Sequence, residues 1–362
     1  MNKVLKAVLG IVILLVILCV LVFVIVYYTR FKTISTIRKL TEYEDGYGLY
    51  SMDIDYNYSI QDIIDSGFTD TQGYVDAVVK ESLPLLPVHI KLPSFGCSTY
   101  RCATTDGEMV MGRNYDFKLD TSCMMVKCHP KDGYKSIAFA ALSNLGANDA
   151  DANMAKKMAC LTAPFSCLDG VNEKGVSIAV LTLDSEPTDQ NLGREKMTHS
   201  LAIRLVLDKA ATTEEAVKLL EKYDFYAANG RDYHLFISDA LGDSAVVEND
   251  PESEDRTFTV TRMQAITNFY GMYADKVISK QKNGIYGHGK ERYDYMMEVI
   301  DANNGLVDKD SSWQALKAAA TEPNPESVTS NTQWSIVFNN TKGTADICIR
   351  RHWDDMYSFS ID

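Results

Sequence analysis

The first strong pattern in the chain is an uninterrupted run of apolar residues near its start. Residues 7–28 carry no charged side chain, and two tyrosines close the run. At about 1.5 Å per residue, a helix of this length crosses the hydrocarbon core of a bilayer. The run lacks the short apolar core and small-residue cleavage site of a secretory signal, so the pattern favours an uncleaved single-pass anchor.

This run divides the chain into a short tail (1–6), an anchor (7–28), a leader (29–96) and one main domain (97–362). The leader is polar and rich in Tyr and Asp, and its patterns predict helices over 33–42 and 71–83. The length of the rest suits one large catalytic core.

Short β-rich runs begin at Cys97. Alternating residues at 98–104, a turn at Asp106-Gly107 and a run at 108–111 predict a β-hairpin. Two more hairpins are expected, and a buried strand is expected at 177–183. The further hairpins pair 234–238 with 244–248, and 334–339 with 345–350.

Helical patterns separate these strands. Residues 194–210 and 212–223 are amphipathic, and Thr212 with Glu215 predicts a capping box at the start of the second helix. Strands at both ends with helices between them indicate an α+β fold in which helices pack on antiparallel sheets.

The charge balance limits the kinds of partner that the chain is expected to bind. With 36 basic and 49 acidic residues the net charge is −13, which argues against nucleic acid and against polybasic attachment to anionic lipid. Membrane association is therefore assigned to residues 7–28. Basic residues flank the run on both sides and therefore do not decide which end of the helix faces the cytoplasm. Because a signal-anchor with a short tail commonly exports the domain behind it, we expect the main domain outside the cytoplasm, at the cell membrane.

Eight cysteines are too few for a disulfide scaffold in a chain of this length. The pairs Cys123/Cys128 and Cys160/Cys167 are near enough in sequence to form bridges in an exported domain, but small buried side chains are the favoured interpretation. Their spacing is too wide for a usual zinc knuckle and the six histidines do not cluster beside them, so no metal and no cofactor are expected.

The most informative stretch for chemistry is Gly96-Cys97, followed by residues 112–117. A thiol becomes nucleophilic when a cation or base lies beside it, and Arg113 and Asp116 are placed to supply that field from the paired strand. Gly96 leaves the carbonyl before Cys97 open to the thiol. Taken alone, this pattern fits a buried structural cysteine equally well.

Further motifs follow Cys97 in a fixed order. They are Gly112-Arg113-Asn114-x-Asp116, Asp169-Gly170-x-Asn172-Glu173-Lys174-Gly175, Ile237-Ser238-Asp239, Thr267-Asn268, Arg292 at a helix start, and Thr332-x-Trp334. Together they make residues 97–362 resemble the choloylglycine hydrolase family of linear amide hydrolases, which belongs to the N-terminal-nucleophile (Ntn) hydrolases and is related to penicillin V acylase and N-acylethanolamine acid amidase.

The resemblance implies a four-layer αββα sandwich and hydrolysis of a non-peptide C–N bond in a small-molecule N-acyl amide. It implies that cleavage after Gly96 frees Cys97 as the nucleophile, with the new α-amine as the base. Asp116 is then expected to orient the amine, and Arg113 to favour the thiolate.

The same resemblance assigns the remaining site residues. Asn268 and a backbone N–H near Thr182 are expected to stabilise the oxyanion, and Arg292 to support the site electrostatically. Thr182 departs from the asparagine of bile-salt-cleaving members, which weakens the case for bile salts. Cleavage inside the chain is also required, because Cys97 lies behind the anchor and leader.

Several alternatives stay open. The enzyme could be a penicillin V acylase or an acyltransferase of the same superfamily, or the chain could be a non-catalytic, membrane-tethered binding protein. Cys102 is a weaker candidate nucleophile because Arg101, not glycine, precedes it, and Asn172 fits a turn better than a catalytic role. Homo-oligomerisation, retention of the leader after cleavage and the autocatalytic nature of that cleavage are not decided by the sequence.

Overall fold

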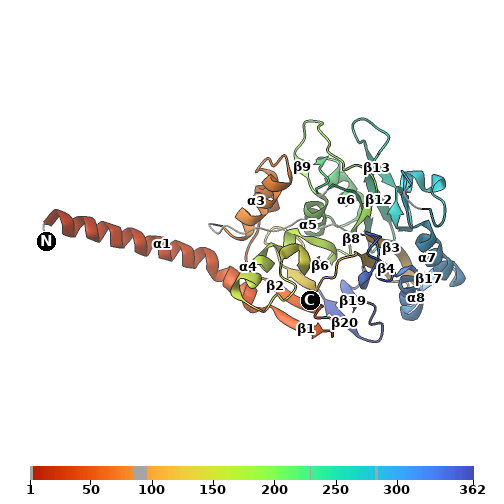
Figure 1. Cartoon of the computed structure of the whole chain (residues 1–362), viewed down its shortest axis with the longest axis horizontal. Helices are drawn as coiled ribbons and strands as arrows, with labels where there is room; N and C mark the ends of the chain where they lie inside the picture. The colour runs from red at the N-terminus through yellow and green to blue at the C-terminus, as the bar shows by residue number, and fades with distance from the viewer. Residues whose placement is uncertain (1–2, 85–95, 229, 282–283) are drawn as a thin grey trace.

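Two large β-sheets form the centre of the molecule, and helices lie outside them (Figure 1). The computed structural model describes residues 3–84, 96–228, 230–281 and 284–362. Phe95, on the leader side of the expected cleavage site, lies outside the described residues.

The larger sheet has nine strands in the order β1-β2-β5-β6-β7-β8-β11-β12-β13. All neighbours are antiparallel except β2 and β5. Strands such as β6 and β8 are buried along their whole length, as expected where both faces of a sheet are covered. The strands are β1 (Arg38–Glu42), β2 (Gly48–Ile54), β5 (Cys123–Cys128), β6 (Ser136–Ala141), β7 (Cys167–Asn172), β8 (Ser177–Leu183), β11 (Asp232–Ser238), β12 (Ser244–Asn249) and β13 (Phe258–Thr261).

The second sheet has seven strands and carries Cys97. Its order is β14-β3-β4-β18-β19-β20, and β17 pairs with β3 as well. Two short ladders, β9 with β10 and β15 with β16, complete the described strands. The second sheet consists of β3 (Gly96–Thr104), β4 (Met109–Asp116), β14 (Ala265–Ile266), β17 (Leu306–Val307), β18 (Thr332–Asn339), β19 (Thr344–Ile349) and β20 (Met356–Ser360). The short ladders consist of β9 (Lys196–Met197), β10 (Asp224–Phe225), β15 (Asn268–Phe269) and β16 (Gly287–His288).

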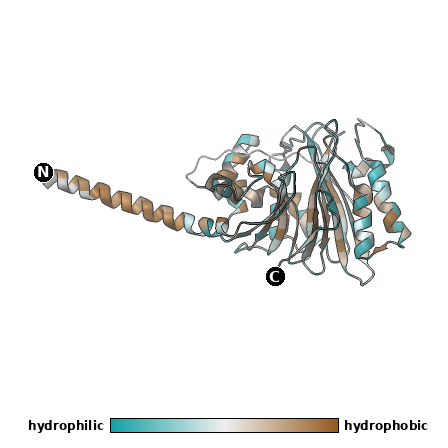
Figure 2. Cartoon of the chain, turned by 60° about the horizontal axis from the view of Figure 1, so that its bottom comes forward, coloured by the Kyte–Doolittle hydropathy of each residue, from teal (hydrophilic) through white to brown (hydrophobic). Residues whose placement is uncertain are grey.

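Helices cover the outer side of each sheet. α5 contacts β7 and β8, α6 contacts β11 and β12, and α7 and α8 pack together against β3, β4 and β18. The inner sides meet where β3 contacts β8. Figure 2 shows apolar residues through the sheets and hydrophilic residues on the outer helices. The described helices after Cys97 are α4 (Met154–Ala159), α5 (His199–Lys209), α6 (Thr213–Leu220), α7 (Lys290–Ala302) and α8 (Lys309–Ala319), with 3-10 turns η1 (Leu142–Leu145), η2 (Cys160–Phe165) and η3 (Gly271–Lys276).

The apolar run forms α1 (Lys3–Ser35), which projects from the domain (Figures 1 and 2). The most apolar window within its segment Val8–Ser35 has a mean hydropathy of 3.7, and none of that window is buried against the rest of the protein. One helix of this kind is long and apolar enough to cross a membrane, a property that an N-terminal signal sequence shares.

The described part of residues 29–96, the expected leader, is built into the fold of the main domain. β2 pairs with β5 from Leu49↔Cys123 to Ile54↔Cys128, so a leader strand extends the larger sheet. α2 (Ile60–Ile64) and α3 (Thr71–Ser82) lie beside the domain, and leader tyrosines donate hydrogen bonds into it. The hydroxyls of Tyr56 and Tyr74 bind the carbonyls of Leu161 and Phe165 in η2, the second at 3.0 Å.

The three expected hairpins and the 177–183 strand are confirmed. Thr212 caps α6 through a bond from the Glu215 backbone N–H at 3.1 Å, but the Glu215 carboxylate accepts from Ala211 and not from the cap residue itself. The helix expected at 194–210 begins at His199, because Lys196–Met197 pairs with β10 instead.

The helix predicted at 33–42 is wrong. The apolar helix continues to Ser35, and Arg38–Glu42 pairs with β2 as an edge strand. The helix predicted at 71–83 is confirmed as α3. The coarse α+β class is also confirmed, although the sheets are not purely antiparallel, because β2–β5 and β17–β3 are parallel pairs.

Candidate active site

Cys97 is the second residue of β3, between the two sheets. It stands opposite Tyr115 of β4, and Gly96 stands opposite Asp116. Its side chain is fully buried, and the Sγ–H donates to the Val180 carbonyl of β8 at 3.2 Å. The candidate nucleophile is thus held by its backbone in one sheet and by its thiol in the other.

Arg113 reaches from β4 to the same carbonyl. Its Nη2 donates to the Val180 oxygen at 3.0 Å, and its Nε lies 2.7 Å from Oδ2 of Asp169 on β7. Arg113 and Asp169 are both fully buried. A buried charge needs a partner, so this ion pair ties the two sheets together beside the thiol.

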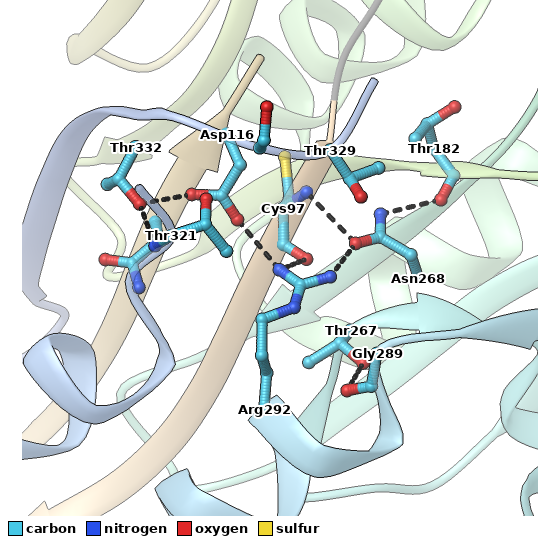
Figure 3. Close-up of polar contacts among 12 residues, drawn as sticks. Cys97, Asp116, Thr182, Thr267, Asn268, Gly289, Arg292, Thr321, Thr329 and Thr332 are labelled. Atoms are coloured by element: carbon cyan, nitrogen blue, oxygen red, sulfur yellow. Dashed lines mark hydrogen bonds and ion pairs between the residues drawn. The ribbon is translucent and has the colours of Figure 1, made fainter. Parts of the chain in front are cut away.

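Arg292 approaches Cys97 from the other side, at the start of α7. Its Nη1 lies 2.8 Å from Oδ2 of Asp116 and donates to the Cys97 carbonyl at 3.4 Å, while Nη2 donates to Oδ1 of Asn268. Thr332 of β18 donates to the second Asp116 oxygen at 2.6 Å. One guanidinium therefore joins the backbone of the nucleophile to a carboxylate and an amide (Figure 3).

The side-chain amide of Asn268 is oriented at both ends. Its Oδ1 accepts from the Cys97 backbone N–H at 3.4 Å, and its Nδ2 donates to the Thr182 carbonyl at 2.8 Å. The Thr182 side chain points elsewhere, with its Oγ1 accepting from Arg231 at 3.2 Å. Thr182 therefore contributes its backbone to this arrangement.

A glycine turn sets the approach of Arg292. Gly289 has φ of 81°, and a Cβ there would lie 2.6 Å from Nη2 of Arg292. Thr267 Oγ1 donates to the Gly289 carbonyl at 2.8 Å. Glycine is required here both for the left-handed backbone and for the space that the guanidinium occupies.

Burial dominates the protonation of the site. It raises the pKa of Cys97 to about 12, although the Arg113 guanidinium acts in the opposite direction. Burial also raises the pKa of Asp116, opposed by Arg292. The expectation that Arg113 favours the thiolate has the right sign, but in the uncleaved chain the loss of hydration outweighs it.

The structure brings together the five side chains expected from the sequence: Cys97, Arg113, Asp116, Asn268 and Arg292. One detail differs from the expectation. The Cys97 nitrogen, which is expected to become the amine on cleavage, contacts Asn268. The Asp116 carboxylate instead binds Arg292 and Thr332.

Sequence reasoning gave no role to Asp169 or Thr332. Both lay inside the recognised motifs, which is the signal that could have marked them. The complete burial of the strand that carries Asp169 is visible only in the structure. Asn172 takes a turn position as expected: its Oδ1 accepts from the N–H groups of Lys174 and Val176.

All eight cysteines are free. Cys123 and Cys128 stand at opposite ends of β5, which separates them by about 16 Å at 3.3 Å per residue, so this pair cannot form a bridge. Cys160 and Cys167 are buried thiols. Over the described ranges, no group of three His, Cys, Asp or Glu residues is arranged to hold a metal ion.

The fold matches solved Ntn hydrolases. A mutant of conjugated bile acid hydrolase from Clostridium perfringens superposes with a TM-score of 0.52 at 16% identity, over 73% of this chain and 92% of that chain. Penicillin V acylase from Agrobacterium tumefaciens gives 0.51 at 18% identity, over 73% and 86%. At these identities the likeness defines the class of fold.

Sequence comparison gives the family. A family model described as acyl-coenzyme A:6-aminopenicillanic acid acyl-transferase matches residues 102–352. The chain belongs to this family, that of the choloylglycine hydrolases and penicillin V acylases. The matched segment contains Arg113, Asp116, Asn268 and Arg292 and begins five residues after Cys97.

A shorter match links the chain to a curated relative. Penicillin V acylase of Pectobacterium atrosepticum is 38% identical over an alignment of 94 residues that covers 23% of this chain and 25% of that protein. The chain thus spans about a quarter of the length of this relative.

Because the guanidinium of Arg292 binds three groups at once, even a conservative substitution by lysine should reduce the proposed activity strongly. In Arg292→Lys a single ammonium cannot bind Asp116, Asn268 and the Cys97 carbonyl together, so we expect amide hydrolysis to fall by about 10²-fold. The measurement is kcat/KM on an N-acyl amide. Arg101→Lys, on the same strand as Cys97 but away from this cluster, serves as the control and should stay within about twofold of wild type. Equal losses in both variants would contradict the role of Arg292.

Proposed function

We propose that this protein hydrolyses linear amide bonds with Cys97 as an N-terminal nucleophile, released by cleavage after Gly96. The observation that carries the proposal is the convergence of Arg113, Arg292 and Asn268 on the backbone and thiol of Cys97. Membership of a family of amide hydrolases and acyltransferases supports it.

The first step is processing of the chain. The Cys97 sulfur attacks the Gly96 carbonyl carbon, the C–N bond between the two residues breaks, and the acyl group moves to sulfur. Water then hydrolyses the thioester and leaves Cys97 with a free α-amine. Gly96 suits this step because it places no side chain in the path of the thiol.

The free amine then becomes the base. Its ordinary pKa of about 7.7 to 8 allows it to accept the thiol proton and return it to the leaving amine near neutral pH. The thiolate attacks the substrate carbonyl, the amine product leaves, and water releases the acid from the acyl-enzyme. This transfer gives the thiol, whose pKa burial raises to about 12 in the uncleaved chain, a route to its reactive form.

Asn268 is the proposed oxyanion donor. Its Nδ2 donates to the Thr182 carbonyl, and Arg292 fixes the orientation of the amide by donating to its Oδ1. With a backbone N–H near Thr182 it would stabilise the tetrahedral oxyanion, an interaction worth about 10²- to 10³-fold in rate per donor. Asp116 would hold Arg292 in place, and through it the amide.

We extend the proposal to the domain plan. In this plan the two sheets and their outer helices form a four-layer αββα sandwich. Residues 97–362 are the hydrolase, 29–96 the leader, 7–28 a membrane anchor and 1–6 a tail. The apolar, projecting α1 supports the anchor, and an N-terminal signal-anchor would place the domain outside the cytoplasm.

The leader is proposed to stay bound after cleavage. It supplies β1 and β2 to the larger sheet, and its tyrosine hydroxyls satisfy carbonyls of η2. Its loss would expose an edge strand and unpair buried groups, each costing about 1–3 kcal/mol. The anchor and the hydrolase domain would then remain together in one non-covalent complex.

A related activity is the second candidate. The family model takes its description from an acyltransferase, and a curated relative is a penicillin V acylase. An acyl-enzyme on Cys97 could be resolved by an amine in place of water, which would give acyl transfer from the same site. The substrate could likewise be a bile conjugate, another N-acyl amide or a β-lactam.

Hydrolysis is tested directly with Cys97 and a matched thiol. The full chain, purified in detergent, is assayed with N-acyl amides, bile conjugates and penicillin V, and Cys97→Ala should lose turnover of any substrate by more than about 10³-fold. Cys102→Ala, which removes another buried thiol of β3, should retain it within a few-fold. Turnover that survives in Cys97→Ala would refute the assignment of the nucleophile.

Leader retention is tested by separating the processed protein under two conditions. Fragments 1–96 and 97–362 should co-elute in mild detergent and separate only after denaturation, because strand pairing and not the chain holds them. Elution of 97–362 alone from mild detergent would show that the leader dissociates.

A further inference from the structure

A polar cavity of about 770 Å³ adjoins the proposed catalytic residues. Leu183, one of its lining residues, directly follows Thr182, and His288 is paired in register with Asn268. Thr329, also in the lining, is drawn among the side chains around Cys97 in Figure 3. None of the five candidate side chains is in the described lining, but these neighbours place the cavity beside the site, where it can hold part of a substrate.

The two basic residues of this cavity, Arg231 and His288, both bind the carboxylate of Asp184. Arg231 forms an ion pair with Asp184, and its Nε donates to Thr182 Oγ1 at 3.2 Å. His288 Nδ1 lies 2.5 Å from the other oxygen of Asp184, and its Nε2 is 2.8 Å from Thr329 Oγ1. An anionic substrate group would have to displace Asp184 before it could bind Arg231 or His288.

Two further carboxylates in the lining remain without a cation. Glu186 and Glu326 are exposed, and neither makes an ion pair with any described residue. Arg256 is near Glu186, but it donates to the Glu186 backbone carbonyl and lies 4.0 Å from Asp232. The described lining thus has three carboxylates against one guanidinium and one imidazole, within a chain of net charge −13.

We infer that this cavity selects amides bearing a positively charged group, such as a primary ammonium, and rejects amides that place a carboxylate or sulfonate there. The inference rests on the proposed hydrolysis at Cys97 and assigns the substrate charge for that site. Glu186 and Glu326 are its specificity-determining residues: they attract the cation, while Asp184 keeps Arg231 and His288 from serving as an anion site.

The test compares amides that differ only in charge. One series keeps the acyl group and varies the leaving amine as neutral, ammonium-bearing or carboxylate-bearing, and a second series places the same charges on the acyl group. In at least one series we expect kcat/KM to be about tenfold higher for the cationic than for the neutral amide, and lowest for the anionic one. The series that shows this order identifies the half of the substrate in the cavity.

The carboxylates are tested in the same assay. Glu186→Gln/Glu326→Gln should reduce the cation-to-neutral ratio of kcat/KM to near one, and added salt should reduce the wild-type ratio. Glu298→Gln, an exposed carboxylate of α7 outside the cavity, should leave the ratio unchanged.

The outcomes separate two failures. Hydrolysis that favours anionic amides, or a ratio that the double variant does not change, overturns the inference while the proposed function stands. Hydrolysis of no amide in either series, with the chain folded, refutes the proposed function itself.

Discussion

The buried guanidinium of Arg113 sets the main constraint on this molecule. It belongs to β4 of one sheet but finds its carboxylate, Asp169, and its carbonyl acceptor, Val180, in the other. An unpaired charge in this position would cost several kcal/mol, so the two sheets must meet in the one arrangement that satisfies it. The same arrangement places the thiol of Cys97 against the Val180 carbonyl. The position of the candidate nucleophile follows from the pairing of a charge.

Arg292 plays the corresponding part on the other side of Cys97. It comes from α7, far along the chain, and reaches Asp116, Asn268 and the Cys97 carbonyl through one planar fork. A lysine offers a single point charge and cannot hold three acceptors in fixed directions. Arg292 therefore fixes the directions of Asn268 and Asp116 beside Cys97, which is the arrangement that the proposed oxyanion stabilisation requires.

Local signals accounted for much of the fold. The hairpin of β3 and β4 was predictable because Gly107 supplies the left-handed turn residue between two alternating runs. The ordered motifs indicated the family and identified the five candidate side chains. The α6 cap at Thr212 was likewise readable from its own residues.

Long-range pairing was not predictable. Arg38–Glu42 has the composition of a helix continuation, but its pairing with β2, and that of β2 with β5, decide its structure. The role of Asp169 was not predicted either, because it depends on an arginine from another sheet. The charge of the cavity depends likewise on which of its groups are paired, which only the assembled fold reveals.

The central claim is that Cys97 becomes the first residue of the working chain, and N-terminal sequencing with intact mass measurement of the full chain in detergent tests it most directly. The account predicts a new N-terminus at Cys97 in the wild type and a single uncleaved chain in Cys97→Ala. A wild-type chain that hydrolyses amides while remaining uncleaved, or a Cys97→Ala chain cleaved at the same bond, would contradict it.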